Sequence, residues 1–131
     1  AYAAFDRHAW FPLPEMRPVG EPGALLWTAA TQTLVVAFPE EVFFRAFLQG
    51  RLAAVVARPR RLLGANVGWE WPLAAAAFTM THLPTRGATG LVVFPPALLF
   101  GWAFARAGTI WPGVLYHGAC NTLAYALAGR A

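Results

Sequence analysis

The chain has 131 residues, enough for one domain, and 58% of them are hydrophobic while 12% are charged. These proportions lie outside those of soluble proteins, so a membrane protein is favoured over a soluble helical one. The ten basic residues are all arginine and give a formal net charge of +4. They form no basic stripe between polar residues, which excludes a nucleic acid partner. A single cysteine, Cys120, excludes an internal disulfide and any multi-cysteine zinc cluster.

The first 23 residues carry four of the eleven prolines, and we expect an interfacial or loop segment there. Because the chain begins with alanine, we expect it to be truncated at the N-terminus, with further spans before it. Residues 24–57 contain only Gly50 and Pro39 as helix breakers, which predicts a helix. About 34 residues at ~1.5 Å each span ~51 Å, longer than a bilayer core. This helix is therefore expected to bend at Pro39 or to project from the membrane.

Three further helices are predicted after a basic loop at residues 58–68. The second runs from about residue 69 until Pro84 and Gly87 end it, and the third covers residues 90–107 with a kink at Pro95 and Pro96. The fourth covers residues 109–128. No strand signal is seen. The expected fold is all-α: a polytopic transmembrane helix bundle of about four helical segments, with residues 24–131 forming the core.

The placement of arginines predicts the orientation in the membrane. Cytoplasmic loops carry an excess of positive charge, so the side with more arginines is expected to be cytoplasmic. Glu40 and His82 then lie toward the opposite face. The larger group is Arg51, Arg58, Arg60, Arg61 and Arg106, against Arg86 and Arg130.

Ionisable residues inside membrane spans are costly and mark functional sites. Glu41 and Arg45 lie four residues apart with the acid first, the favourable order for an ion pair on one helix face. Glu40 is turned by about 100° from Glu41 and cannot share that arrangement equally. One carboxylate is therefore interpreted as structural, and Glu40 as available to act as a general base or acid.

Two more pairs share a helix face by the same spacing. His117 and Asn121 present an imidazole and a carboxamide to one space on the fourth helix. On the second helix, the ring of Phe78 can pack beneath His82. If the helices form one bundle, Glu40, His82, His117 and Asn121 converge on one cavity.

Three motifs thus follow one another along the chain, on three predicted helices. They are EExxxR at Glu40, Glu41 and Arg45, FxxxH at Phe78 and His82, and HxxxN at His117 and Asn121. In this order within a hydrophobic chain they resemble the CPBP family of intramembrane proteases, also called the CAAX protease or bacteriocin-processing family. The resemblance covers residues 24–128 and every key position matches. Within the family, the myxosortase branch, which removes carboxyl-terminal sorting helices, is a candidate subgroup.

The resemblance implies peptide bond hydrolysis in or at the edge of the membrane. Glu40 with His82 would hold and deprotonate a water, and His117 with Asn121 would stabilise the oxyanion. The implied substrate is a membrane-anchored or lipid-modified protein, and membrane lipids are the other partner. Ten arginines and no lysine favour a bacterial inner membrane protein with several spans. Structural support is assigned to Glu41, Arg45 and Phe78.

The role of a metal stays open at this point. The family is often called a metalloprotease family, yet the chain has no HExxH pair on one helix. Zinc held by Glu40, His82 and His117 from three helices is the alternative to a site without a cofactor.

Other readings of the same residues are weighed against proteolysis. The polar residues also fit a non-catalytic immunity or scaffold protein that binds a partner, or a small transporter with Glu40 as its proton site. Asn121 alone fits a hydrogen bond between helices. Cys120, three residues from His117, is a weak candidate nucleophile, since small apolar packing is its ordinary role in a helix.

Overall fold

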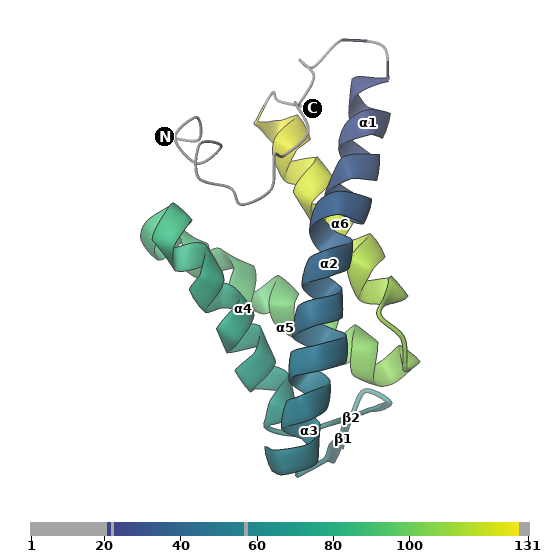
Figure 1. Cartoon of the computed structure of the whole chain (residues 1–131), viewed down its shortest axis with the longest axis vertical. Helices are drawn as coiled ribbons and strands as arrows, with labels where there is room; N and C mark the ends of the chain where they lie inside the picture. The colour runs from purple at the N-terminus through teal and green to yellow at the C-terminus, as the bar shows by residue number, and fades with distance from the viewer. Residues whose placement is uncertain (1–20, 22, 57, 129–131) are drawn as a thin grey trace.

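The structure is a computed structural model that describes residue 21, residues 23–56 and residues 58–128, most of them helical. The first helical run is continuous from residue 24 to residue 56 (Figure 1). The predicted segment at residues 1–23 lies outside the described residues, apart from Glu21 and Gly23. The parts of the first run are α1 (Ala24–Thr31), η1 (Gln32–Ala37), α2 (Phe38–Glu41), η2 (Val42–Gln49) and α3 (Gly50–Val56).

Two stretches of this run, η1 and η2, have the wider hydrogen bonding of a π-helix. Phe38 N–H bonds to Thr33 O and Gly50 N–H bonds to Arg45 O, each five residues back. Pro39 lies between the two stretches, and in a regular α-helix its ring would clash with the carbonyl four residues earlier. The wider turn before Pro39 relieves that clash, so the helix continues through the proline.

The basic loop is folded as a β-hairpin, which the sequence pattern did not predict. β1 (Arg60–Leu62) and β2 (Ala65–Val67) pair in antiparallel register. The expectation of an all-α fold without strands was wrong for these residues. Three-residue strands are too short for an alternating pattern to stand out. The turn at Leu63 and Gly64, both with positive φ, lacks the usual Asn-Gly signature.

Four helical elements follow the hairpin in the described chain. They are α4 (Glu70–Arg86), the 3-10 helix η3 (Gly87–Val93), α5 (Phe94–Ala107) and α6 (Trp111–Leu127). Gly87 caps the end of α4 as predicted, whereas Pro84 lies inside the helix. The predicted kink at Pro95 and Pro96 was wrong, since both lie in the first turn of α5. Prolines are tolerated in a first turn because the N–H groups there have no intrahelical partner.

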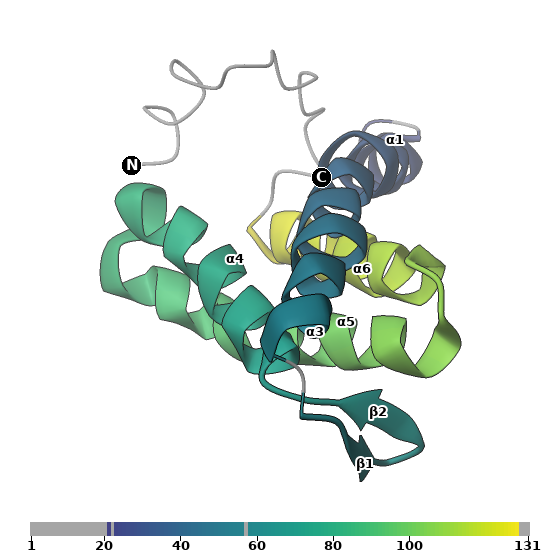
Figure 2. The ribbon, with the colours of Figure 1, turned by 60° about the horizontal axis from the view of Figure 1, so that its bottom comes forward.

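The hydrophobic core lies where η2, α4 and α5 meet. Phe44, Ala75, Phe78 and Ala97 form one buried cluster. Phe44 meets Phe78 edge-on, with 5.1 Å between the ring centroids. α4 and α5 lie side by side in both views of the ribbon (Figures 1 and 2). This core fixes Phe78 at the floor of the polar site described below.

On the other side of the first helical run, α6 packs against α1 and η1. The approach is very close at Gly118, where a Cβ atom would overlap Thr33 of η1. Glycine removes the side chain that would hold the two helices apart. The contact brings His117, the neighbour of Gly118, to the level of the two glutamates.

One helical stretch in the described residues, Glu70–Ala107, is long and apolar enough to cross a membrane by length and composition. Its most apolar part is only 28% buried inside the protein. Large apolar side chains are exposed on other helices too, among them Leu26, Leu34 and Leu127. Such exposure is unfavourable in water and is expected where lipid surrounds the helices.

Candidate active site

The innermost part of the site is the ion pair between Glu41 and Arg45. Arg45 Nε donates a hydrogen bond of 3.0 Å to Glu41 Oε2, and both side chains are 0% exposed. Burial of two charges is tolerable when each neutralises the other. The Arg45 guanidinium also lies over Phe78, with Cζ 5.5 Å from the ring centroid. The helix spacing alone predicts this pair.

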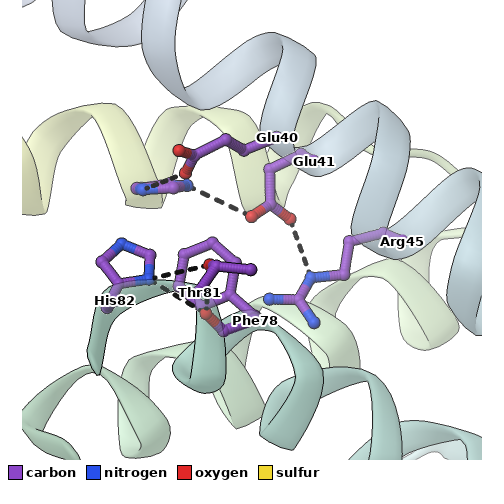
Figure 3. A network of polar contacts seen from close by, with 7 residues as sticks. Glu40, Glu41, Arg45, Phe78, Thr81 and His82 are labelled. Atoms are coloured by element: carbon purple, nitrogen blue, oxygen red, sulfur yellow. Dashed lines mark hydrogen bonds and ion pairs between the residues drawn. The ribbon is translucent and has the colours of Figure 1, made fainter. Parts of the chain in front are cut away.

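His117 of α6 lies between the two glutamates. Its Nδ1 is 3.2 Å from Glu41 Oε1, and its Nε2 is 3.5 Å from Glu40 Oε2. The first contact is a hydrogen bond, in which Nδ1–H donates to the carboxylate. Glu41 therefore accepts from Arg45 with one oxygen and from His117 with the other (Figure 3).

Two aromatic rings fix the plane of the His117 imidazole. Phe100 of α5 stacks on it at 5.1 Å between centroids and 15° between planes. Phe78 of α4 meets it edge-on at 5.5 Å and 82°. With the ring held this way, Nδ1 stays directed at Glu41 while Nε2 faces Glu40.

His82 approaches from the opposite side, on α4. Its Nδ1 is 2.9 Å from Phe78 O and 3.3 Å from Thr81 Oγ1, and its ring lies 4.6 Å from that of Phe78. A carbonyl oxygen only accepts, so Nδ1 of His82 carries a proton in this contact. In the neutral ring Nε2 then has a free lone pair. Figure 3 shows His82 and Glu40 on different helices of the same polar site, with no dashed line between them.

The structure therefore brings together some of the predicted residues and not others. Glu40 and His117 are in contact, and His82 and His117 share the ring of Phe78. No direct hydrogen bond or ion pair between described residues joins Glu40 to His82. Asn121 lies one helical turn beyond His117, partly buried, and makes no hydrogen bond to another described residue.

Comparison with protein families identifies the family to which the chain belongs. A family model described as type II CAAX prenyl endopeptidase Rce1-like matches residues 22–123, which is most of the chain. The chain belongs to the Rce1-like family. Neither the curated proteins nor the solved structures compared with it include a match. The resemblance drawn from the three motifs is thereby confirmed, and the protein is a member of a family of membrane-embedded proteases.

Whether a metal ion could bind at this site depends on which donor atoms the site offers. Among residues 23–56 and 58–128, no three His, Cys, Asp or Glu side chains are grouped closely enough to hold a metal ion. Glu40, His82 and His117 in this arrangement therefore do not form a three-ligand site. Nδ1 of His82 bonds to a backbone carbonyl and Nδ1 of His117 to Glu41, so Nε2 is the nitrogen of each ring that is left for a ligand.

Two further residues of the candidate site were not among the predicted site residues. Phe100 is 2% exposed and stacks on His117, but nothing in its local pattern distinguishes it from a core phenylalanine. Gly113 lies against Glu41, where a Cβ atom would be 2.7 Å from Oε2. Its place one turn before His117 on the same helix is a signal that could have identified it.

Several polar atoms of the site are buried without a hydrogen bond partner among the described residues. They are Glu40 Oε2 and both terminal nitrogens of Arg45. The 3.5 Å contact between Glu40 and His117 is of ion-pair length without hydrogen bond geometry. Buried polar atoms are normally satisfied by protein or ordered water, so the site has capacity to bind water. The side chain of Glu40 remains 34% exposed, which gives it access to a further ligand.

Proposed function

We propose that the protein is an intramembrane endopeptidase that hydrolyses a peptide bond of a membrane-associated substrate with a water activated by Glu40 and His82. Membership of the Rce1-like family supports the reaction class. The observation that supports the mechanism is that two proton acceptors, one on α2 and one on α4, lie in one polar site around His117 and Phe78. One is the carboxylate of Glu40, and the other is the Nε2 lone pair that remains when Nδ1 of His82 donates to Phe78 O.

A water between these acceptors donates one hydrogen to each, which leaves a lone pair of its oxygen for the scissile carbonyl carbon. As the carbon–oxygen bond forms, one proton passes from the water to Glu40 and the carbonyl oxygen becomes an oxyanion. Collapse of this intermediate breaks the carbon–nitrogen bond. The leaving amine then takes the proton from Glu40, which restores the carboxylate.

His117 and Asn121 are proposed to stabilise the oxyanion. When the imidazole of His117 carries both protons, its Nε2–H points toward Glu40 and the space beside it. The carboxamide of Asn121 supplies N–H donors one turn along α6 and has no other hydrogen bond partner among the described residues. Donors aimed at a developing oxyanion each contribute on the order of 10²–10³ in rate.

Glu41, Arg45 and Phe78 are proposed as the support of the reacting groups. Glu41 holds Nδ1 of His117 by a hydrogen bond, and Arg45 compensates the charge of Glu41. The Phe78 ring contacts both histidines. In this proposal none of the three touches the substrate.

The proposed reaction needs no cofactor, and no step is routed through zinc. The proposed substrate is a membrane-anchored or lipid-modified protein, which the family description of a type II CAAX prenyl endopeptidase supports. We place the protein in the inner membrane of a bacterium, with the four helical runs as a polytopic bundle. The exposed apolar side chains on these helices support a location in a membrane.

The test is cleavage of a membrane-anchored reporter library by purified protein in lipid, with wild type, Glu40→Gln and His82→Ala, each with and without a strong zinc chelator. Loss of cleavage in both folded variants, with wild type unaffected by chelator, is the expected result. A folded Glu40→Gln that cleaves at the wild-type rate excludes the mechanism. Loss of wild-type activity in chelator alone would instead assign a metal to the reaction.

A further inference from the structure

The β-hairpin is attached to the helix bundle by the buried side chains of β2 and by one backbone carbonyl of β1. Ala65 and Val67 of β2 are 1% and 5% exposed, whereas every residue of β1 is exposed. Trp102 of α5 donates from Nε1 to Leu62 O at 3.1 Å. Figure 2 shows β1 and β2 at the end of the bundle where α3 ends. The hairpin is therefore a positioned element with an outward strand, and not a loose connection.

Positive charge gathers on this element without acidic compensation. Arg58, Arg60 and Arg61, hereafter the hairpin arginines, are all exposed. Among described residues, the carboxylate nearest to them in sequence is Glu70, which is buried and accepts a hydrogen bond from Gly68 N at 2.7 Å. None of the hairpin arginines forms a salt bridge with a described residue. Their guanidinium groups are thus available to an anionic partner.

The turn of the hairpin is apolar, exposed and strained. Leu63 is 80% exposed and has a φ of 48°, a conformation that a bulky residue rarely adopts. The following Gly64 has a φ of 81°, and a Cβ there would lie 2.7 Å from Nε of Arg106. The underlying α5 thereby fixes the turn in place. In water, an exposed leucine in this conformation has neither a conformational nor a hydrophobic advantage.

Both features have one explanation at a membrane surface. Guanidinium groups bind lipid phosphates by paired hydrogen bonds, and an apolar turn gains free energy when it enters the acyl region beside them. Trp69, which follows the hairpin and is 62% exposed, is of the type found at the interface between lipid and water. A nucleic acid would engage the arginines but gives no role to Leu63.

We infer that the hairpin is an anchor for an anionic phospholipid surface, in which the hairpin arginines bind headgroup phosphates and Leu63 enters the hydrocarbon. The anchor fixes the depth of the α3 end of the bundle in the membrane. It is separate from the proteolytic site, so its test does not depend on cleavage.

The experiment places a spin label on the outward face of the hairpin at Asn66→Cys, in a Cys120→Ala background, with the full chain in lipid nanodiscs. Collision with oxygen and with a water-soluble nickel complex reports whether the label contacts lipid or water. Discs of zwitterionic lipid are compared with discs of about 30% anionic phosphatidylglycerol, a content chosen to give a surface potential like that of anionic membranes. The variants are a triple change of the hairpin arginines to glutamine and the control Arg86→Gln, an exposed arginine at the end of α4.

We expect anionic lipid to shift the label toward lipid. Each hairpin arginine should raise the partition coefficient of the hairpin onto the anionic surface about fivefold at low salt. High salt and the triple variant should abolish the shift, and Arg86→Gln should retain it. Equal accessibility in both lipids, or an unchanged shift in the triple variant, overturns the inference. Protection of the label by an added oligonucleotide, with no effect of lipid charge, overturns it as well.

A second variant tests the inference independently, in case the triple variant does not fold. Leu63→Asn keeps the turn conformation, since asparagine tolerates positive φ, but removes the apolar tip. The label should then move toward water by a clear margin in anionic discs. An unchanged depth in this variant would contradict insertion of the turn.

Discussion

Gly113 leaves no room for a side chain against Glu41: a Cβ atom at this position would lie 2.7 Å from Glu41 Oε2. The Glu41 carboxylate accepts hydrogen bonds from both Arg45 and His117. The packing of α6 on the first helical run therefore determines where the Arg45 and His117 side chains lie.

Gly113→Ala should displace the Glu41 carboxylate and destabilise the fold by about 1–3 kcal/mol, the usual cost of overpacking. Cleavage should fall as well, because His117 loses its orientation. Thermal unfolding in detergent measures the first effect. Gly50→Ala is the matched control, since its Cβ would meet nothing closer than 4.0 Å. Equal melting temperatures of the two variants would contradict the tight contact.

Breaking the buried ion pair from one side should cost more than removing both charges. Glu41→Gln and Arg45→Met each leave one group unpaired, with an expected loss of about 3–5 kcal/mol, whereas the double variant should recover part of this loss. A double-mutant cycle on unfolding free energies gives the coupling. Strictly additive losses would mean that the two side chains act independently, against the 3.0 Å contact.

The tautomer of His82 is a direct test of the proposed base. Nδ1 is bonded to Phe78 O, so the neutral ring should carry its proton on Nδ1 and none on Nε2. Nitrogen NMR of protein with labelled histidine distinguishes the two forms, and a His82→Asn variant assigns the signal. A predominant Nε2–H form would leave no lone pair for the water.

Phe100 is expected to act through His117. Phe100→Leu keeps an apolar side chain but removes the stacked ring, so kcat should fall by more than KM rises, because the imidazole loses its fixed plane. Phe100→Ala should in addition cost about 3–5 kcal/mol through the cavity it leaves. Phe43→Leu, at a side chain that is 52% exposed, is the control. A Phe100→Leu variant with wild-type kcat would remove the positioning role.

Asn121→Ala should lower kcat by up to about 10²–10³ while the melting temperature stays close to that of wild type. The reason is that Asn121 makes no hydrogen bond to another described residue, so its loss removes a donor to the oxyanion and no structural contact. Leu123→Ala, an exposed position on the same helix, controls for general damage to α6. A large drop in melting temperature with normal kcat would make Asn121 a structural residue.

Contacts within one helix could be predicted from the sequence, and contacts between helices could not. The pair of Glu41 with Arg45 and the packing of His82 on Phe78 follow from a spacing of four residues. The bond from His117 to Glu41 depends on how α6 crosses the first helical run. No local pattern fixes that crossing.

The same limit explains what was missed or displaced. Phe100 reaches His117 only because α5 and α6 pack together, and the hairpin forms from strands too short to carry a period. Glu40 was expected to share a site with His82, and its contact in the described residues is with His117. The joint action of Glu40 and His82 on a water stays a prediction.

The π-helical stretch η2 makes the first helical run tolerant of a change in length. Each π-turn holds one more residue than an α-turn, so removing a single residue from Val42–Gln49 would let the helix close to the ordinary pitch. The residues after the deletion would then keep their orientation relative to Glu40 and Glu41, because the wider turn had absorbed the extra residue. A one-residue deletion in α1 has no wider turn to remove, and it would rotate one side of the helix relative to the other by about 100°. One-residue deletions that spare Arg45 and Gln49 should therefore be milder in η2 than in α1, a difference that substitution scans overlook.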